Sequence, residues 1–394
     1  MTTPWPRYAE AAKKEGFYLI VLWDKERKNN NALNKVYPFA DELYMIDFKD
    51  VERMEALVEL IHRSEPLDYI YHLGKDEHME MAYKIAQKYN MNLNPLDAIS
   101  NMNDKFKMRK HLKKKNISSI QYELANMGNI EEKVKNFNFP FIVKPTNLSG
   151  SKGVLLCEKQ EDLNNWKEYL LNYDYEGDYL IEEYLVGKEV SVETLSFQGK
   201  HFIVGITDKI KTPPPIFVEL GHVFPSCMDD KLKTEITMLV LDVLESFNYQ
   251  FGPVHTEVII TEHGPKIVEL QPRLAGDRIP ILIEYSTGCS VENTIFKMLE
   301  GDSPQITKNE GISRIHYFQW KPGKVKEIKG IEKILEFSSV KQVEINIQQN
   351  DWIATLLDST TRPGYVIVSG SSYEELESEI KKIEDTVEIL YYPI

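Results

Sequence analysis

The N-terminal quarter of the chain alternates between short apolar runs and stretches in which apolar residues recur with helical spacing. The apolar runs predict strands at Phe17–Trp23, Leu43–Phe48 and Leu67–Leu73. The helical spacing predicts helices at Tyr8–Glu15, at Val51–Arg63 and from about Glu77 to Tyr89. Strands that alternate with helices are typical of a parallel sheet covered on both faces. We therefore expect an α/β domain over residues 1–95.

The first predicted helix follows Pro4–Trp5–Pro6 directly, without a strand before it. In a doubly wound α/β unit, the turn into the first helix normally follows a strand. Two interpretations fit this pattern: the unit lacks its first strand, or the natural chain begins upstream of this one.

The pattern changes after residue 95. Helices are predicted over Asp97–Lys115, which is strongly basic, and over Glu161–Leu171 and Asp229–Phe247. Strands, several of them joined by hairpin turns, are predicted at Phe139–Lys144, Val154–Glu158, Tyr179–Glu183, Glu189–Phe197 and His201–Thr207. Shorter strands and a last helix are predicted at Ile312–Phe318, Gln342–Ile347, Tyr365–Ser369 and Tyr373–Ile383. This order favours an α+β arrangement, with one domain over residues 96–305 and a smaller one over 306–394.

Composition and charge narrow the class of protein. The chain has 394 residues, with 47 Lys and Arg against 61 Asp and Glu, which gives a net charge of −14. An acidic chain of this kind is a poor general binder of nucleic acids or membrane surfaces. The 3 cysteines are far apart and form no CxxC pair, so we expect neither a zinc ribbon nor a disulfide framework. Because the chain shows no secretory signal and no apolar run of roughly 20 residues, we expect a cytoplasmic protein.

Two lysines and a small-residue loop are candidates for binding phosphate. Lys144 ends the apolar segment FPFIVK just before a proline, so its ammonium group should point beyond the end of a strand. Lys105 lies in NDKFKMR, at the start of the basic helix. The loop Thr146–Gly153 (TNLSGSKG) joins two predicted strands, and backbone N–H groups in such loops can close over phosphate oxygens. Its candidate residues are Ser149, Gly150 and Ser151.

The segment Ile181–Glu193 (IEEYLVGKEVSVE) is open to two interpretations. It fits an amphipathic strand whose acids lie in water. It also fits a purine-binding edge, in which backbone groups of Glu183 and Leu185 pair with adenine while an acid holds the ribose hydroxyls.

The segment HTEVIITEHGPKIVELQPR carries the strongest signal. It predicts a hairpin that places Glu257 and Glu269 on neighbouring strands, where cross-strand pairing can bring their carboxylates together. Two facing carboxylates repel each other unless a cation lies between them. Gln271 and Arg273 follow on the same strand face by the period of two. Oxygen ligands of this kind suit magnesium or manganese, and the arginine suits phosphoryl transfer; the alternative is a surface hairpin with salt bridges.

The order of these features resembles the ATP-grasp superfamily: a DK lysine, a VKP lysine, a Gly/Ser loop, an EExL hinge and an E…ExxPR hairpin, over roughly Asn101 to Glu300. The stretch HTEVIITEHGPKIVELQPRLAGDRIP is most similar to the L-amino acid ligases, the dipeptide synthetases of the bacilysin and rhizocticin type. The resemblance implies an ATP-grasp fold behind an N-terminal Rossmann-like (pre-ATP-grasp) α/β domain. It also implies a mobile lid at about residues 119–183 and a small C-terminal α+β subdomain.

The resemblance also assigns residues to the nucleotide and the metals. It implies that ATP is held at its phosphates by Lys105 and Lys144, at adenine by Glu182 and the backbone of Glu183 and Leu185, and at the ribose by Glu189. It implies that two magnesium (or manganese) ions bind Glu257 and Glu269. Gln271 stands where the family usually has Asn, so the amide is retained but is one methylene longer.

Three residues are assigned by resemblance to the chemistry itself. Arg273 stabilises the transferred phosphoryl group, Arg278 lies by the amino-acid substrate or the acyl phosphate, and His255 lies on the substrate side of the metals. The implied reaction joins two L-amino acids into a dipeptide through an acyl phosphate, with release of ADP and phosphate. The expected partners are two amino-acid substrates, and we expect a homodimer.

Three alternatives to this reaction fit the same residues. One is another ATP-grasp enzyme, such as a carboxylase component or a D-alanine ligase. Another is a nucleotide-binding protein without turnover, which the presence of Glu257, Glu269 and Arg273 disfavours. A third is RNA binding through the basic run Lys107–Lys115, which a solvated helix beside a phosphate site explains as well.

Overall fold

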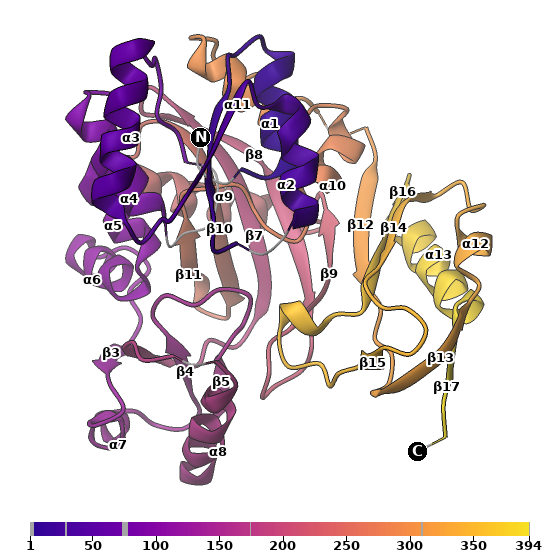
Figure 1. Ribbon diagram of the computed structural model, residues 1–394. Coiled ribbons are helices and arrows are strands. Elements are labelled where there is room, and N and C mark those ends of the chain that lie inside the picture. The colour runs from indigo at the N-terminus through magenta and orange to yellow at the C-terminus, as the bar shows by residue number, and fades with distance from the viewer. Residues whose placement is uncertain (1–3, 28–29, 73–77, 174, 309, 394) are drawn as a thin grey trace.

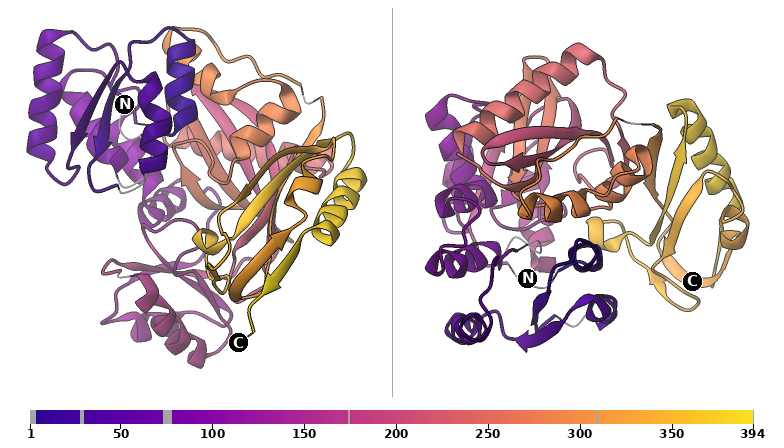
Figure 2. Two further views of the ribbon diagram at one scale, coloured as in Figure 1. Left: turned by 45° about the vertical axis from the view of Figure 1, so that its right-hand side comes forward. Right: turned by 90° about the horizontal axis from the view of Figure 1, so that it is seen from above.

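The computed structural model describes residues 4–27, 30–72, 78–173, 175–308 and 310–393. A large antiparallel sheet stands at its centre, and an N-terminal domain, a four-stranded lid and a C-terminal part surround it (Figure 1). In Figure 2, the left view shows the lid as a lobe below the N-terminal domain, and the right view shows the N-terminal domain and the C-terminal part on different sides of the central sheet. Among the described residues, no helix is long and apolar enough to cross a bilayer.

The N-terminal domain has the predicted helices and two parallel strands. Its elements are α1 (Pro6–Lys14), β1 (Ile20–Asp24), α2 (Asn30–Val36), η1 (Tyr37–Phe39), β2 (Glu42–Ile46), α3 (Val51–Ser64) and α4 (Met79–Lys88). Strand β1 pairs with β2 in parallel, as expected. Buried residues of α1, such as Tyr8 and Ala12, share one core with Phe296 and Leu299 from the domain that follows, so the N-terminal domain is packed against it.

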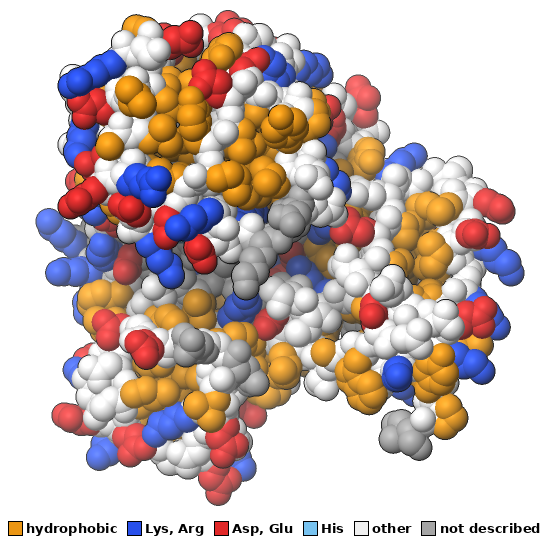
Figure 3. Space-filling view, viewed as in Figure 1, with side chains coloured by type: hydrophobic (Ala, Val, Ile, Leu, Met, Phe, Trp, Pro, Cys, Tyr) orange, Lys and Arg blue, Asp and Glu red, His pale blue; other side chains and the backbone are white. Residues whose placement is uncertain are grey.

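The predicted strand Leu67–Leu73 is wrong over its described part, because residues 67–72 form no strand. Leu73 and the expected helix start at Glu77 lie outside the described residues. Ile70 and Tyr71 line an apolar groove together with Ile20 of β1, instead of pairing with that strand. A strand needs a partner backbone about 4.8 Å away, and apolar periodicity alone does not provide one. Figure 3 shows apolar side chains gathered on the surface of the N-terminal domain, in the upper part of the picture.

The basic helix is divided in two, which corrects the single helix expected over Asp97–Lys115. The parts are α5 (Leu96–Asn103) and α6 (Lys105–Lys115). Asp104 between them has an extended backbone, and its carboxylate accepts a hydrogen bond from the Lys107 amide at 2.7 Å. Asp is favoured at this capping position because it satisfies an amide that the first helical turn leaves unpaired.

The lid is a four-stranded antiparallel sheet with helices on its outer side (Figure 1). Its strands run in the order β3 (Tyr122–Ala125), β6 (Tyr179–Glu183), β4 (Phe141–Pro145) and β5 (Leu155–Cys157). The helices are α7 (Ile130–Lys133), η3 (Val134–Asn136), α8 (Gln160–Leu170) and η4 (Leu171–Tyr173). Trp166 of α8 is fully buried, and its indole donates to the Gly153 carbonyl at 2.8 Å. The helix thereby holds the end of the small-residue loop 146–153.

The central sheet has eight antiparallel strands and joins the middle of the chain to its end. Their order is β11 (Gly264–Gln271), β10 (Gly252–Thr261), β7 (Lys188–Phe197), β8 (Lys200–Lys211), β9 (Glu219–Phe224), β12 (Ile312–Tyr317), β16 (Gly364–Gly370) and β14 (Val340–Ile345). The helices that pack against it include α9 (Asp230–Ser246), α10 (Ile279–Thr287), α11 (Val291–Leu299) and, on the C-terminal strands, α13 (Tyr373–Thr386). Because β9 pairs with β12, the C-terminal part extends the same sheet.

The C-terminal part adds a three-stranded sheet that the sequence pattern did not predict. Its order is β15 (Trp352–Ile353), β13 (Gly323–Lys329) and β17 (Glu388–Tyr391). The remaining elements are α12 (Ile331–Ile334), η5 (Ser359–Thr361) and α13 (Tyr373–Thr386). The last of these confirms the predicted terminal helix, and it buries Leu376, Ile380 and Ile383. The α+β character expected for this part is therefore confirmed.

Removal of the Asp104 cap tests the division of the basic helix. We expect Asp104→Ala to lower the free energy of unfolding by about 1 kcal/mol, because an amide at the start of α6 loses its acceptor. Asp104→Asn should retain most of that stability, since its side-chain oxygen also accepts. Urea unfolding of the three proteins measures the difference; equal stability of Asp104→Ala and the parent would contradict the role of the cap.

Candidate functional site

One cavity lies between the lid sheet and the central sheet, and it collects most of the predicted site. All the residues assigned to the nucleotide line it: Lys105, Lys144, Ser149, Gly150, Ser151, Glu182, Glu183, Leu185 and Glu189. The three residues assigned to metal line it as well: Glu257, Glu269 and Gln271. Apolar side chains from both sheets, including Ile142, Ile259 and Val268, complete the lining. The cavity therefore has an apolar portion of the kind that suits a flat ring and a highly charged portion.

A buried triad of charges stands at the lid side of the cavity. Glu182, only 4% exposed, contacts Arg109 and lies 2.6 Å from the Lys144 ammonium group. Burial alone would raise the pKa of Glu182, but the two cations outweigh it and lower that pKa to about 2. Arg109 also donates to the Ile267 carbonyl at 2.6 Å, which ties α6 and β6 to β11. The charges thus fix the lid strand to the central sheet.

The predicted pair of acids faces across the hairpin as expected. Glu257 of β10 is the register partner of Glu269 of β11. Lys209 lies 2.6 Å from Glu257, and Lys105 lies 3.0 Å from Glu269. The Gln271 amide donates to Glu269 at 2.7 Å. Each acid is therefore neutralised by a lysine from another element.

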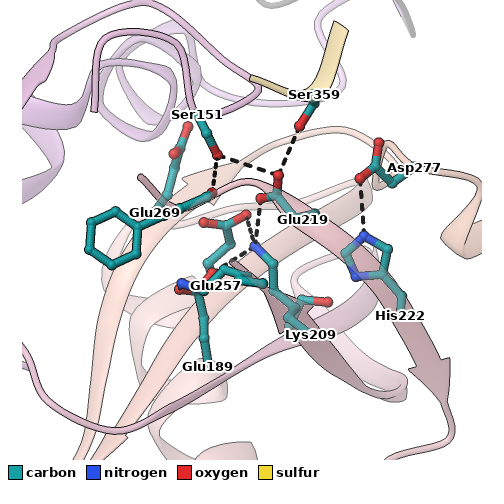
Figure 4. Close-up of polar contacts among 12 residues, drawn as sticks. Ser151, Glu189, Lys209, Glu219, His222, Glu257, Glu269, Asp277 and Ser359 are labelled. Carbon is teal, nitrogen blue, oxygen red and sulfur yellow. Dashed lines mark hydrogen bonds and ion pairs between the residues drawn. The ribbon is translucent and has the colours of Figure 1, made fainter. Parts of the chain in front are cut away.

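Lys209 is the centre of the second charge cluster (Figure 4). Its ammonium group contacts Glu189 at 2.7 Å, Glu257 at 2.6 Å and Glu219 at 3.5 Å. Burial would lower the pKa of Lys209, but the three carboxylates outweigh it and hold that pKa well above its usual value. Glu189, assigned to the ribose, also contacts Lys211. Burial would raise the pKa of Glu189, but the two lysines lower it.

His255 lies two residues before Glu257 on β10, opposite Gln271, and does not line the cavity. Its Nδ1 is 2.9 Å from Glu193, and its Nε2 is 3.5 Å from Glu257. Burial would lower the pKa of His255, but the two carboxylates outweigh it and raise that pKa to about 9. The histidine therefore contacts Glu257 from a neighbouring position on the same strand.

The two predicted catalytic arginines are also outside the cavity lining. Arg273 donates to the neighbouring Leu274 carbonyl at 2.9 Å. Arg278 begins α10 with a left-handed backbone, and its guanidinium group lies 3.9 Å from the Tyr365 ring and 3.2 Å from Glu344. The C-terminal part therefore holds Arg278. The two acids near Arg278 in sequence pair with other arginines, Asp277 with Arg362 and Glu284 with Arg7.

Four charged residues of the site were missed by sequence reasoning: Arg109, Lys209, Lys211 and Glu219. Arg109 was assigned to a solvated basic helix, but it is only 2% exposed. Its position four residues after Lys105, on the same helix face, was a usable signal. Lys209 and Glu219 lie on β8 and β9, and no local pattern distinguishes them from ordinary strand residues.

The charge balance of the cavity fits a divalent metal. Six carboxylates line it, against four cationic side chains: Glu182, Glu183, Glu189, Glu219, Glu257 and Glu269, with Lys105, Arg109, Lys144 and Lys211. Among the residues that the structure describes, no group of three or more His, Cys, Asp or Glu could hold a metal by itself. Magnesium is commonly bound by one or two carboxylates together with substrate phosphates and water. The Glu257–Glu269 pair matches that pattern.

Comparison with known families agrees with this geometry. An ATP-grasp domain model matches residues 137–281, which include the loop, the hinge and the hairpin. An L-amino acid ligase C-terminal domain model (domain 2) matches residues 316–391. The middle of the chain is therefore similar to the ATP-grasp family. Its C-terminal part is similar to the C-terminal domain of L-amino acid ligases.

Individual relatives extend the comparison. The chain is 23% identical over 307 residues to dapdiamide A synthase of Enterobacter agglomerans, with 73% of this chain and 72% of the relative covered. It is 28% identical over 294 residues to alanine–anticapsin ligase of Bacillus amyloliquefaciens, with 68% and 61% covered. The crystal structure of an L-amino acid ligase from Bacillus licheniformis superposes with a TM-score of 0.83 at 20% identity, covering 99% of this chain and 96% of that chain.

The structural likeness confirms the ATP-grasp fold with its N-terminal α/β domain. The sequence matches are shorter than the relatives themselves. The aligned region covers 61% of the length of the alanine–anticapsin ligase and 52% of the length of a further relative.

Neutralisation of Glu182 should destabilise the protein. In Glu182→Gln, Arg109 and Lys144 remain buried without their counter-ion, which typically costs about 3–5 kcal/mol. The neighbouring Glu183→Gln is a matched control, because Glu183 is only half-buried, and its effect should stay within about 0.5 kcal/mol. Chemical unfolding of both variants measures the difference; equal effects would show that the triad does not stabilise the fold.

The same triad predicts a dependence on pH. Because the folded-state pKa of Glu182 is about 2 and its ordinary value is 4.5, its contribution is fully present above pH 4.5. The contribution is lost as pH falls from about 4.5 towards 2. The difference in Tm between the parent and Glu182→Gln should therefore shrink over that window. A difference that stays constant down to the acid limit of folding would refute the assignment.

Proposed function

We propose that this protein is an ATP-dependent carboxylate–amine ligase that joins two L-amino acids into a dipeptide. The observation that supports the proposal most is the combination of one charged cavity with the C-terminal domain. The cavity collects the lysines, the loop and the acid pair between two sheets. The C-terminal domain is of the L-amino acid ligase type and extends the same central sheet.

In this proposal, ATP lies between the lid and the central sheet. Its adenine occupies the apolar portion lined by Ile142 and Val268, beside the backbone of Glu183 and Leu185. Its phosphates face Lys105 and Lys144 and the loop of residues 149–151. Both lysines are nearly buried, so their charge is little screened by water.

Glu257 and Glu269 would hold the metal, with the Gln271 amide beside them. We propose two magnesium or manganese ions, as the resemblance implies. When bound, such ions neutralise phosphate charge and polarise the reacting oxygens. Lys105 and Lys209 neutralise these acids in the structure. Lys105 lines the cavity and would turn towards phosphate once a cation takes its place, whereas Lys209 would keep its contacts with Glu189 and Glu219.

The reaction proceeds in two steps. The carboxylate of the first amino acid attacks the γ-phosphorus of ATP, which forms an acyl phosphate and releases ADP. The amine of the second amino acid then attacks the acyl carbon, and phosphate leaves with the bonding electron pair. The amine proton passes to a phosphate oxygen or to a base. We propose that Arg273 stabilises the phosphoryl group and that Arg278 lies near the acyl end, while His255 steadies Glu257.

The choice of amino acids as substrates is supported by the relatives. Alanine–anticapsin ligase and dapdiamide A synthase carry names that describe ligation or synthesis, and each aligns over more than two thirds of this chain. We propose that the enzyme works in the cytoplasm, where ATP and free amino acids are available, and that it forms a homodimer.

The alternative functions give different outcomes in a single assay. The protein is incubated with ATP, Mg²⁺, ¹³C-labelled bicarbonate and amino acids, the last singly and in pairs. Released phosphate is measured, and new amides and labelled products are identified by mass spectrometry. We expect an ATP-dependent dipeptide with some pair of amino acids. Tight ATP binding without any product would support the non-catalytic alternative, and a product that contains bicarbonate carbon would support the carboxylase alternative.

The acid pair can be tested without relying on the product. Glu269→Gln should reduce phosphate release by at least roughly a hundredfold, the scale of losing one charge-stabilising group. In the parent, we expect ADP with Mg²⁺ to raise the Tm more than ADP alone does. Glu269→Gln should abolish this Mg²⁺-dependent difference in Tm. Glu262→Gln, an exposed acid at the turn of the same hairpin, is the matched control and should behave as the parent. Retention of the Mg²⁺-dependent rise in Glu269→Gln would exclude Glu269 as a ligand.

A further inference from the structure

A short segment of the C-terminal part reaches across to the cavity. Residues 357–362, here called the C-terminal clasp, connect β15 to β16 and include η5. The clasp is internally braced: the Asp358 carboxylate accepts hydrogen bonds from the Thr360 amide at 2.7 Å and from its hydroxyl at 2.6 Å. Thr361 donates to the Asp358 carbonyl at 2.8 Å. Hydrogen bonds within the clasp itself therefore hold its conformation.

The clasp contacts the lid through two tyrosines. Tyr169, near the end of α8, donates its hydroxyl to the Leu357 carbonyl at 2.9 Å. Tyr173, in η4, donates to the Asp358 carboxylate at 2.7 Å. Burial raises the pKa of Tyr173, and the hydrogen bonds to Tyr169 and Asp358 raise it further, so the hydroxyl stays protonated as a donor.

The clasp also contacts the loop assigned to phosphate. The Ser359 amide donates to the Gly150 carbonyl at 3.3 Å. The Ser359 hydroxyl donates to Glu219 at 2.8 Å, and Ser151 contacts the same carboxylate oxygen at 3.3 Å (Figure 4). Glu219 of β9 is thus contacted by one hydroxyl group from the loop and by another from the clasp.

A third contact joins the clasp to the turn before α10. Arg362 makes two parallel hydrogen bonds to Asp277, both at 2.7 Å, and lies 3.6 Å from the Tyr317 ring. It also donates to the Glu219 carbonyl at 3.2 Å. Asp277 immediately precedes Arg278 in that turn, and both have a left-handed backbone. The clasp therefore meets the lid, the loop and this turn at once.

We propose that the C-terminal clasp is a latch that holds the lid and the loop 146–153 closed over the cavity during the reaction. This inference rests on the proposed ligase function. An acyl phosphate reacts readily with water, so a closed loop protects it until the amine arrives. Most contacts to the lid and loop are single hydrogen bonds, which are individually weak enough to break when the lid opens. In this role Asp358, Ser359 and Arg362 are positioning residues that act through the lid, the loop and the turn.

The latch can be tested with a double variant of the full chain, Tyr173→Phe with Ser359→Ala. These changes remove two side-chain hydrogen bonds of the clasp and keep the size of each side chain close to the original. Tyr391→Phe is the matched control: it removes a tyrosine hydroxyl that donates to the Lys321 carbonyl at 2.8 Å within the C-terminal part. Single Ser359→Ala serves in its place if the double variant does not fold.

Two measurements are compared. The first is hydrogen–deuterium exchange of the peptides that cover residues 146–153 and 357–362, with and without ADP and Mg²⁺. We expect exchange there to be roughly tenfold faster in the double variant and unchanged in the control. The second is the ratio of phosphate released to dipeptide formed, which should rise severalfold because water reaches the acyl phosphate.

The outcomes separate the latch from the ligase function. The latch is overturned if hydrogen–deuterium exchange of these peptides is the same in the double variant and the parent, or if the control changes it equally. This holds whatever the ligase activity of the variants. Faster exchange with an unchanged ratio of phosphate to dipeptide overturns its role in protecting the intermediate. If the parent forms no dipeptide with any pair, the ligase proposal fails, and the exchange comparison alone decides whether the clasp holds the loop.

Discussion

Neutralisation of buried carboxylates is the constraint on which this structure depends. An isolated charge in a cavity between two sheets is too costly to keep, so each acid needs a cation within contact distance. Glu182 has Arg109 and Lys144, Glu257 has Lys209, and Glu269 has Lys105. These cations come from α6, β4 and β8, whereas the acids come from β6, β10 and β11. The Lys144–Glu182 pair lies within the lid and the Lys209–Glu257 pair within the central sheet. Arg109 and Lys105 of α6 pair with Glu182 of the lid and Glu269 of the central sheet, so these two pairs form only when α6 is docked against both sheets.

The same constraint explains why the site suits a nucleotide with metal. The lysines that neutralise the acids in the structure are the groups that a phosphate chain would attract. In the proposed complex, metal ions would take the place of the lysines beside the acids, and the phosphate chain would pair with the lysines that line the cavity. A preformed arrangement of this kind needs little reorganisation when charge develops during a reaction.

The central sheet gives the molecule its continuity. The strands on the central-sheet side of the cavity and the strands β12, β16 and β14 of the C-terminal part belong to one sheet. The two groups are joined where β9 pairs with β12. This connection carries the segment 357–362 to the edge of the lid and carries Tyr365 and Glu344 to Arg278. The C-terminal domain is therefore a structural part of the site, although it lies far from the lysines and the loop in sequence.

Local sequence determined those parts of the site that depend on strand period and turn length. The hairpin from Glu257 to Glu269 could be predicted because a tight turn fixes the register and the period of two fixes the face. Lys144 could be placed because it ends an apolar strand. Only the tertiary structure decided the break at Asp104, the burial of Arg109, the cluster around Lys209 and the contacts of Arg278. The burial of Arg109, the cluster around Lys209 and the contacts of Arg278 depend on partners distant in sequence, whereas the cap at Asp104 is local, from the Lys107 amide. Residues 67–72 also depend on a distant partner, because an apolar run becomes a strand only when another backbone lies beside it.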